Sequence, residues 1–359
     1  MRNLFASLST ACCRLLSIAW IAGVVFVLTS PVCASEAPEE LLRNTIRASD
    51  WMASAHFKVS FEASSVVKAE DGTVERHHTS SGQVEIITDG PRLRYVKQNA
   101  DRDGVPGMRM EVLVTPERRL MWVEDDFVQY TESPILIASA AALDRTLNEA
   151  SWPLEGRVPL DRKRPVFDLA GALEEGKPLP EVVDEVVNGI PCKKVTVHGD
   201  GWQWECWVAP SRGYGLAKQV FVAEAREKVG RAAFRSTVDH VTFKEVNDAS
   251  TGTSRWLAEA GTIEIASPGT KSTRITTIEV KRTAINLTPD YTELRAFETP
   301  QIPDGIEVLL ETPDDQGQAA PRGPLRYVWK GGRVEPLHDP ATIERIRKEI
   351  EKAREEKAR

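Results

Sequence analysis

The chain has 359 residues, a formal net charge of −7 from 46 Lys and Arg against 53 Asp and Glu, and 41% hydrophobic residues. This composition is typical of a globular protein and not of a disordered chain. Because clustered Lys and Arg are needed to neutralise the phosphates of nucleic acids, an acidic chain without a basic stretch argues against a nucleic-acid partner.

The first 34 residues have the three parts of a secretory signal peptide. Arg2 and Arg14 form a basic start, residues 15–28 are an uncharged apolar run, and small residues precede an expected cleavage after Ala34. The apolar run is shorter than the about 20 residues that a transmembrane helix needs. We therefore expect cleavage, a mature chain of net charge −9 without a stable membrane span, and export to the periplasm or cell envelope.

Alternation of apolar and polar residues predicts many β-strands and few helices. Helices are expected at residues 36–54, 134–150 and 165–175. Strands are expected at 57–63, 82–98 with a turn at 89–91, 108–115, 119–124 and 127–131, and in a second run at 181–187, 191–198, 202–209, 216–224, 234–246, 255–265 and 273–287. Short turns connect most of these strands, which is typical of an antiparallel meander.

These elements predict an α+β protein whose long antiparallel meander forms a curved half-barrel sheet, with helices covering its concave face. The sheet is expected to be buried on both faces in places, since Leu120 and Trp122 lie on one side of their strand and Met121 and Val123 on the other. A closed barrel or a sandwich is the alternative architecture.

After the signal peptide, we expect three further segments. Residues 35–311 form the half-barrel domain, in which a break near 150–180 separates two sheet halves. Residues 312–338 are polar and rich in Pro and Gly at their start, which predicts a linker followed by a short strand. Residues 339–359 predict a charged helix that Asp339 caps, and its apolar stripe is too short for a coiled coil, so we expect a monomer.

Cys192 and Cys206 are the two cysteines of the mature chain, an even number that permits one disulfide in an exported protein. They flank a predicted hairpin with a two-residue turn at Gly199-Asp200. That turn places Cys206 opposite Lys193 and leaves Cys192 on the other face, so the sulfurs meet only if the turn is longer or a bulge intervenes. The compartment and the spacing favour the disulfide, whereas the strand register opposes it.

The sequence contains no group of residues typical of catalysis or metal binding. A G-x-S-x-G nucleophile elbow is absent, and the adjacent His77 and His78 would point to opposite faces of a strand. Residues 101–104 begin like a calcium loop but lack its later acidic ligands. We therefore expect that the protein is not an enzyme and has no metal or cofactor.

Tryptophans are the main candidates for ligand contact. Trp202, Trp204 and Trp207 lie within six residues of one another, the first two on one face of their strand. Large aromatic side chains of this kind line apolar pockets or fill the core of a sheet. We expect Trp122, Trp202 and Trp204 to line the pocket of an apolar ligand, with core filling as the competing interpretation.

Several segments resemble the LolA/LolB superfamily of outer-membrane lipoprotein carriers and periplasmic regulators. An amphipathic helix leads into a long meander, and residues 207–220 (WVAPSRGYGLAKQV) are similar to a W-x-x-P-x-x-G-Y strand-turn-strand element of exported relatives. Asn286 and the stretch from Phe297 to Gly305 resemble the C-terminal edge of those proteins. The resemblance extends over residues 36–311 and implies a half-barrel covered by helices.

The signal peptide, the meander with its helices and the absence of a catalytic group of residues predict a non-enzymatic exported protein that binds an apolar ligand, such as an acyl chain or a part of a lipidated protein partner. The alternative is a periplasmic protein-interaction or sensor module of the envelope-stress-regulator type. An interior apolar cavity of several hundred cubic ångströms would favour the first function. A filled interior with an exposed apolar groove would favour the second.

Overall fold

The structure is a computed structural model. It describes residues 36–100, 107–132, 154, 157–158, 167–225, 233–249, 251–269, 272–313, 319–321, 326–339, 341–345 and 348. The chain divides into two compact units, Met1–Ala37 and Pro38–Arg359, and the described helices and strands belong to the second. The predicted signal peptide and the predicted helix at 134–150 lie outside the described residues.

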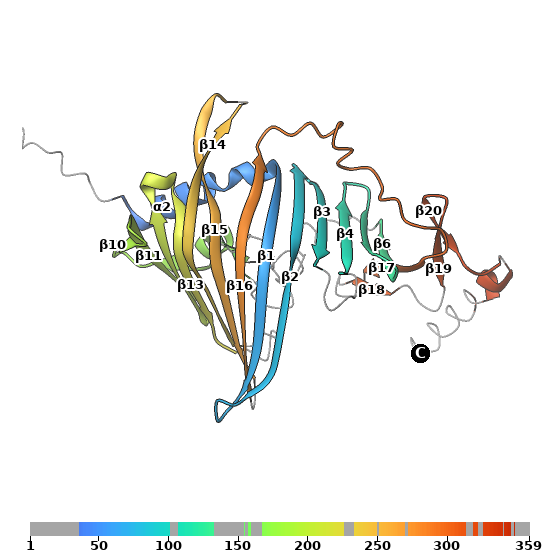
Figure 1. The fold of residues 1–359 in the computed structure, drawn as a ribbon, viewed down its shortest axis with the longest axis horizontal. Helices are drawn as coiled ribbons and strands as arrows, with labels where there is room; N and C mark the ends of the chain where they lie inside the picture. The colour runs from blue at the N-terminus through green and yellow to red at the C-terminus, as the bar shows by residue number, and fades with distance from the viewer. Residues whose placement is uncertain are drawn as a thin grey trace, which may run out of the picture. The chain divides into compact units, whose positions relative to one another are not determined.

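The second unit contains one large, open, curved and mostly antiparallel sheet of 18 strands (Figure 1). Sixteen of its strands follow one another side by side in this order: β10 (Val183–Val187), β11 (Ile190–Gly199), β12 (Trp202–Ala209), β13 (Gly215–Ala223), β14 (Phe234–Asp248), β15 (Thr253–Pro268), β16 (Ser272–Asn286), β1 (Ser54–Ala69), β2 (Val74–Asp89), β3 (Arg92–Asn99), β4 (Arg109–Val114), β5 (Arg119–Val123), β6 (Phe127–Thr131), β17 (Glu307–Pro313), β19 (Tyr327–Lys330) and β20 (Arg333–Pro336).

Short strands complete the structure. In the same sheet, β9 (Lys177–Pro178) pairs with β11 and β18 (Ala319–Pro321) pairs with β17, while β7 (Arg157–Val158) and β8 (Phe167–Asp168) form a separate pair. The pairing of β17 with β6 is parallel. The two predicted runs of strands therefore form one open sheet, which confirms the predicted large curved antiparallel sheet.

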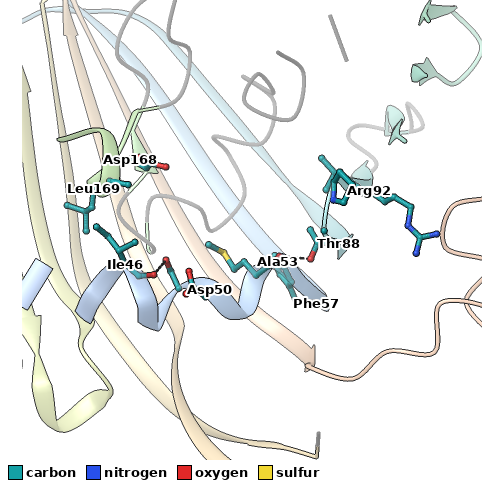
Figure 2. A pocket seen from close by; sticks show the side chains of 14 residues that line it. Ile46, Asp50, Ala53, Phe57, Thr88, Arg92, Asp168 and Leu169 are labelled. Atoms are coloured by element: carbon teal, nitrogen blue, oxygen red, sulfur yellow. Dashed lines mark hydrogen bonds between the residues drawn. The ribbon is translucent and has the colours of Figure 1, made fainter. Parts of the chain in front are cut away.

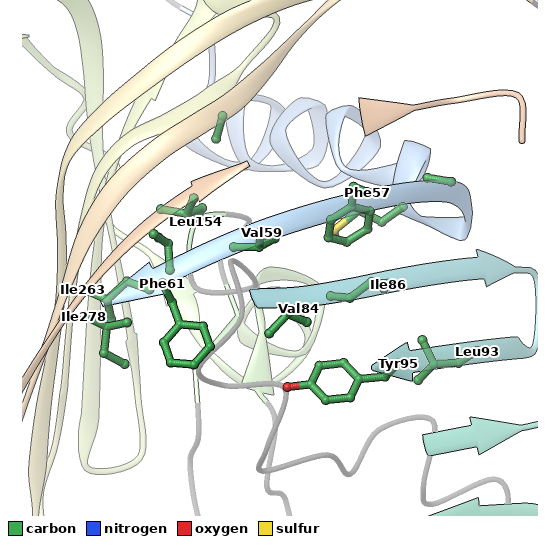
Figure 3. Packing of buried hydrophobic residues seen from close by; sticks show 14 of the residues in the cluster. Phe57, Val59, Phe61, Val84, Ile86, Leu93, Tyr95, Leu154, Ile263 and Ile278 are labelled. Atoms are coloured by element: carbon green, nitrogen blue, oxygen red, sulfur yellow. The ribbon is translucent and has the colours of Figure 1, made fainter. Parts of the chain in front are cut away.

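Strand β1 joins the two runs, because it pairs with β2 on one side and with β16 on the other. Its residues alternate as the sequence predicted: Phe57, Val59 and Phe61 are buried on one face, and Lys58 on the other face is exposed. Figure 3 shows these three side chains together with apolar residues of β2, β3, β15 and β16 in one hydrophobic cluster. Full burial of such a side chain stabilises the fold by about 1.5–3 kcal/mol.

The described helices are few and short: α2 (Pro38–Ala48), η1 (Asp50–Ala53), α4 (Leu169–Glu175) and η4 (Pro210–Arg212). Leu41 and Leu42 of α2 are buried in a second cluster with residues of α4, β11, β12 and β13. Asp168 begins α4, since its Oδ1 accepts a hydrogen bond from the Gly171 amide at 2.9 Å. The helices predicted near residues 36–54 and 165–175 are thus present.

Residues 287–306, which we call the strap, connect β16 to β17 without a regular helix or strand. Phe297 and Ile302 of the strap pack in a third cluster against Leu113, Leu120 and Trp122 of β4 and β5. Alternation along these two strands places this cluster on the opposite face of the sheet from the β1 cluster. The prediction that strands of this region are buried on both faces is confirmed.

Two parts of the sheet were not predicted. Strands β1 and β2 continue through residues 64–69 and 74–81, where side chains of both faces are half-buried or exposed and no apolar alternation exists. Strand β20 extends the predicted short terminal strand into a hairpin. After it, residues 341–345 are helical, and the Ala341 and Thr342 amides donate to Asp339 Oδ1 at 3.0 Å, so Asp339 caps this segment as predicted.

The β11–β12 hairpin has a different register from the predicted one. Its turn is Asp200-Gly201, with Gly201 at a φ of +66°, so Gly199 faces Trp202 and Val195 faces Cys206. Both cysteines are buried free thiols. They lie in different hydrophobic clusters because Cys192 is three residues from Val195 and hence on the opposite face. The expectation of a Cys192–Cys206 disulfide is therefore wrong. The strand register explains why, because the two cysteines lie on opposite faces of the sheet.

An ion-pair cluster links β1 to β2. Glu85 Oε1 lies 2.7 Å from His56 Nε2 and 3.3 Å from Lys58 Nζ. The hydrogen bond with His56 is the largest influence on this carboxyl and, with Lys58, lowers the pKa of Glu85 to about 2, although partial burial opposes the shift.

We predict that Ellman's reagent will detect two free thiols per chain when the protein that begins at Ser35 is unfolded without a reductant. In the native protein the reaction will be slow, since burial raises the pKa of both the Cys192 and the Cys206 thiol and shields them from the reagent. Absence of free thiols in the unfolded, unreduced chain would show that the disulfide forms.

We also predict that Glu85 makes stability depend on pH. Its folded-state pKa lies below that of an unfolded glutamate, about 4.3, so its stabilising contribution is present above that pH and is lost as the pH falls towards 2. The difference in unfolding free energy between wild type and Glu85→Gln should shrink between pH 5 and pH 2.5 in urea titrations. Glu62→Gln, at an exposed position of β1, is the matched control and should show a smaller pH dependence.

Candidate functional site

A pocket of about 340 Å³ lies between α2, η1, the β2–β3 turn and the start of α4 (Figure 2). Its apolar walls come from five side chains of these elements and the neighbouring strands: Ile46, Met52, Phe57, Leu93 and Leu169. All of them except Ile46 are at least nine-tenths buried. The pocket therefore offers a ligand hydrocarbon surface from these walls beside a comparable polar surface.

The polar residues at this pocket hold its walls together. Thr88 Oγ1 donates to the Met52 carbonyl at 2.5 Å and accepts from the Ala55 amide at 3.1 Å, which fastens η1 to β2. Ser49 Oγ donates to the Ile46 carbonyl at 2.8 Å at the end of α2. These groups act within the local structure, so they shape the pocket.

Arg92 lies at one side of the pocket and points away from it (Figure 2). It forms an ion pair with Asp89, and its guanidinium lies 4.4 Å from the centre of the Phe297 ring in the strap. Such a cation–π contact favours this orientation. Arg92 therefore links the β2–β3 turn to the strap and contributes little charge to the pocket interior.

The pocket lies where two hydrophobic clusters meet. Met52, Phe57 and Leu93 belong to the β1 cluster, whereas Leu169 belongs to the cluster of α2, α4 and β11–β13, against which Ile46 also packs. An apolar molecule in this position would contact both clusters and would remove further hydrocarbon surface from water. The apolar walls are suited to binding, and the described residues that line the pocket include no paired nucleophile and base.

A larger cavity, of about 690 Å³, adjoins β1, β2, β3, β15 and β16. Phe61 and Val280 are its large apolar residues, and most of its other lining residues are polar, charged or glycine. Ser60, Glu62 and Lys281 are examples. It therefore has fewer large apolar side chains than the smaller pocket.

The three predicted pocket tryptophans do not line the 340 Å³ pocket, and the structure does not bring all of them together. Trp202 and Trp204 lie in the cluster of β11–β13, where Trp204 Nε1 donates to Gln219 Oε1 at 2.9 Å and both rings contact Phe221. Their burial agrees with the core-filling interpretation. Trp122 lies on the other face of the sheet from the β1 cluster, among residues of the third cluster.

Sequence analysis missed Met52 and Leu93 as pocket residues. Met52 lies in η1 and Leu93 lies near the start of β3. The spacing of apolar residues in each segment indicates only that these positions are buried. The pocket depends on the approach of α4, which is far from them in sequence. A pattern within one segment does not reveal such an approach.

Among the described residues, no group of His, Cys, Asp and Glu is arranged to hold a metal ion. In the same part of the chain, no helix has the length and hydropathy needed to cross a membrane. Both statements concern the described residues and leave the predicted signal peptide aside.

No protein-family model matches the chain, and no curated protein matches it. Solved structures are similar to it. A DUF1329 family protein from Desulfovibrio piger is 12% identical, the match covers 72% of this chain and 98% of that chain, and the TM-score is 0.36. A LolA superfamily protein from Nitrosomonas europaea is 10% identical, the match covers 72% of this chain and 97% of that chain, and the TM-score is 0.36. Another is the MucA/MucB complex of Pseudomonas aeruginosa (11% identity, 72% and 96%, TM-score 0.22).

One of these structures belongs to the LolA superfamily, which the sequence also resembles. With identities of 10–12% and TM-scores of 0.36 and below, the likeness concerns the fold alone. What the protein binds has to be argued from its own residues.

Proposed function

We propose that the protein is a non-enzymatic binding protein that holds an apolar ligand, such as an acyl chain or the lipid of a lipidated partner, in the pocket of about 340 Å³. The observation that carries the proposal is the set of buried apolar walls at the junction of two hydrophobic clusters. The volume lies within the range of about 300–1,000 Å³ that is common for small-molecule sites. In this proposal α2, η1 and α4 cover the concave face of the half-barrel at the ligand.

The apolar ligand supplies the main part of the binding energy in this proposal. Each methylene group that leaves water for the pocket contributes about 0.8 kcal/mol. The Thr88 and Ser49 hydroxyls at the walls are already engaged in hydrogen bonds. A ligand with a hydrocarbon chain is therefore favoured over a small polar metabolite.

The remaining expectations form part of the same proposal. The protein is exported to the periplasm or cell envelope, acts as a monomer and requires no cofactor. A protein-interaction or sensor module is the second candidate. For the second candidate, ligand occupancy of the pocket would be irrelevant and a protein partner would bind the empty form equally well.

A fluorescent fatty acid, cis-parinaric acid, tests the proposal. We expect saturable binding with one site per chain, and we expect Ala53→Trp to weaken it at least tenfold, because Ala53 is an exposed residue at the pocket and an indole there occupies the ligand volume. Ala225→Trp places the same side chain at an exposed position elsewhere and should leave the affinity unchanged.

Circular dichroism and thermal melting should show that both variants remain folded, because both alanines are exposed. Binding that fails to saturate, or equal affinity in the two variants, would refute the proposed pocket. Native mass spectrometry of protein purified from its own cells would identify the chain length of a retained lipid.

A further inference from the structure

A third cavity, of about 460 Å³, lies between the strap and strands β3–β5. Its lining on the side of the strands consists of Arg94, Arg109, Glu111, Trp122 and Glu124. The strap supplies the rest of the lining with residues 294, 295 and 298–301. Since Glu111 and Trp122 alternate with residues of the β1 cluster, the cavity lies on the opposite face of the sheet from that cluster. We call it the strap cavity.

A buried charge cluster forms the floor of the strap cavity. Glu111 faces Trp122 across the β4–β5 pair, and the Glu111 side chain is 1% exposed. Arg94 Nη2 lies 2.7 Å from Glu111 Oε1, and Arg109 Nη2 lies 3.4 Å from Glu111 Oε2. Two guanidinium groups thus offset the cost of burying this carboxylate.

Three polar atoms of this floor lack a hydrogen bond within the described part of the chain. Trp122 Nε1 and Arg109 Nε are buried donors without an acceptor, and Glu111 Oε1, although ion-paired with Arg94, accepts no aligned hydrogen bond. Trp122 itself is 7% exposed. A buried polar group without a partner costs about 1–3 kcal/mol, so a ligand that supplies the missing partners is favoured.

The charges around the strap cavity balance. Three arginines and three glutamates line it: Arg94, Arg109, Arg295, Glu111, Glu124 and Glu298. A ligand with a net charge would meet an equal number of like charges, whereas a neutral polar ligand avoids that penalty. A hydroxyl group both donates and accepts a hydrogen bond, so neighbouring hydroxyls can serve the two unpaired donors and the carboxylate oxygen together.

We propose that the strap cavity binds a neutral saccharide. Its hydroxyl groups accept hydrogen bonds from Trp122 Nε1 and Arg109 Nε and donate one to Glu111 Oε1. Because these atoms are enclosed, the strap moves outward when the saccharide enters. Without the saccharide, two hydrogen bonds attach the strap to the sheet: Arg94 Nη1 donates to the Arg295 carbonyl at 3.1 Å, and Arg118 Nη2 donates to Thr299 Oγ1 at 2.6 Å. The site is separate from the proposed apolar pocket and does not depend on it.

Isothermal titration calorimetry of the mature protein with maltotriose and with N,N′-diacetylchitobiose tests this inference. We expect millimolar or tighter binding of at least one saccharide, and about tenfold weaker binding by Trp122→Phe, which removes the indole N–H and keeps an aromatic ring. Trp256→Phe, the same substitution on β15 outside the strap cavity, should bind as wild type does.

Trp122→Phe should be at least as stable as wild type, because it removes a buried donor that has no acceptor among the described residues. A second variant, Gln301→Trp, fills the cavity from an exposed rim position and should abolish binding, so the test remains decisive if Trp122→Phe folds poorly. The inference is overturned if neither saccharide binds at 50 millimolar, if acetate or phosphate binds equally well, or if both cavity variants retain wild-type affinity.

Discussion

The structure depends on the pairing of β1 with both β2 and β16. This strand, near the start of the described chain, lies in the middle of the sheet, and its partner β16 ends more than 200 residues later. The buried row of Phe57, Val59 and Phe61 gains its neighbours only when both partners are in place. Because contacts so distant in sequence close large loops, we expect the sheet to form late and slowly during folding.

Strands β4 and β5 are covered on both faces, and the two faces of the sheet carry two chemically different sites. On the face of the β1 cluster, apolar side chains meet those of α2 and α4 and leave a hydrocarbon-lined pocket. On the other face, the strap covers β4 and β5 and encloses Glu111 with two arginines. Alternation along strand β3 supplies residues to both sites, because Leu93 lines the apolar pocket and Arg94 lines the strap cavity.

Much of the fold was predictable from the sequence, because apolar alternation marks most strands, as it does at Phe57–Phe61. The extensions at 64–69 and 74–81 have no buried face, so they need no alternation of apolar residues, and hydrogen bonds to neighbouring strands hold them in the sheet. The turn of the β11–β12 hairpin lies one residue later than predicted, which shifts the strand pairing by two residues, because Gly201, not Gly199, takes the left-handed turn conformation while the Trp202 indole covers Gly199. The pocket and the environment of Trp122 depend on contacts between distant segments, which local patterns do not contain.

The run of sixteen strands ends at β10 and β20, and these two edge strands bear on the solubility of the protein. An edge strand exposes unpaired backbone groups to which another copy can add its own strand. Strand β10 carries Val186 at 71% exposure, a side chain favourable for such association, but the strand has only five residues and includes Asp184 and Glu185. Strand β20 has four residues, including Arg333 and Glu335. Short, charged edges of this kind oppose the growth of one sheet into the next, so an architecture that never closes into a barrel still resists forming fibres.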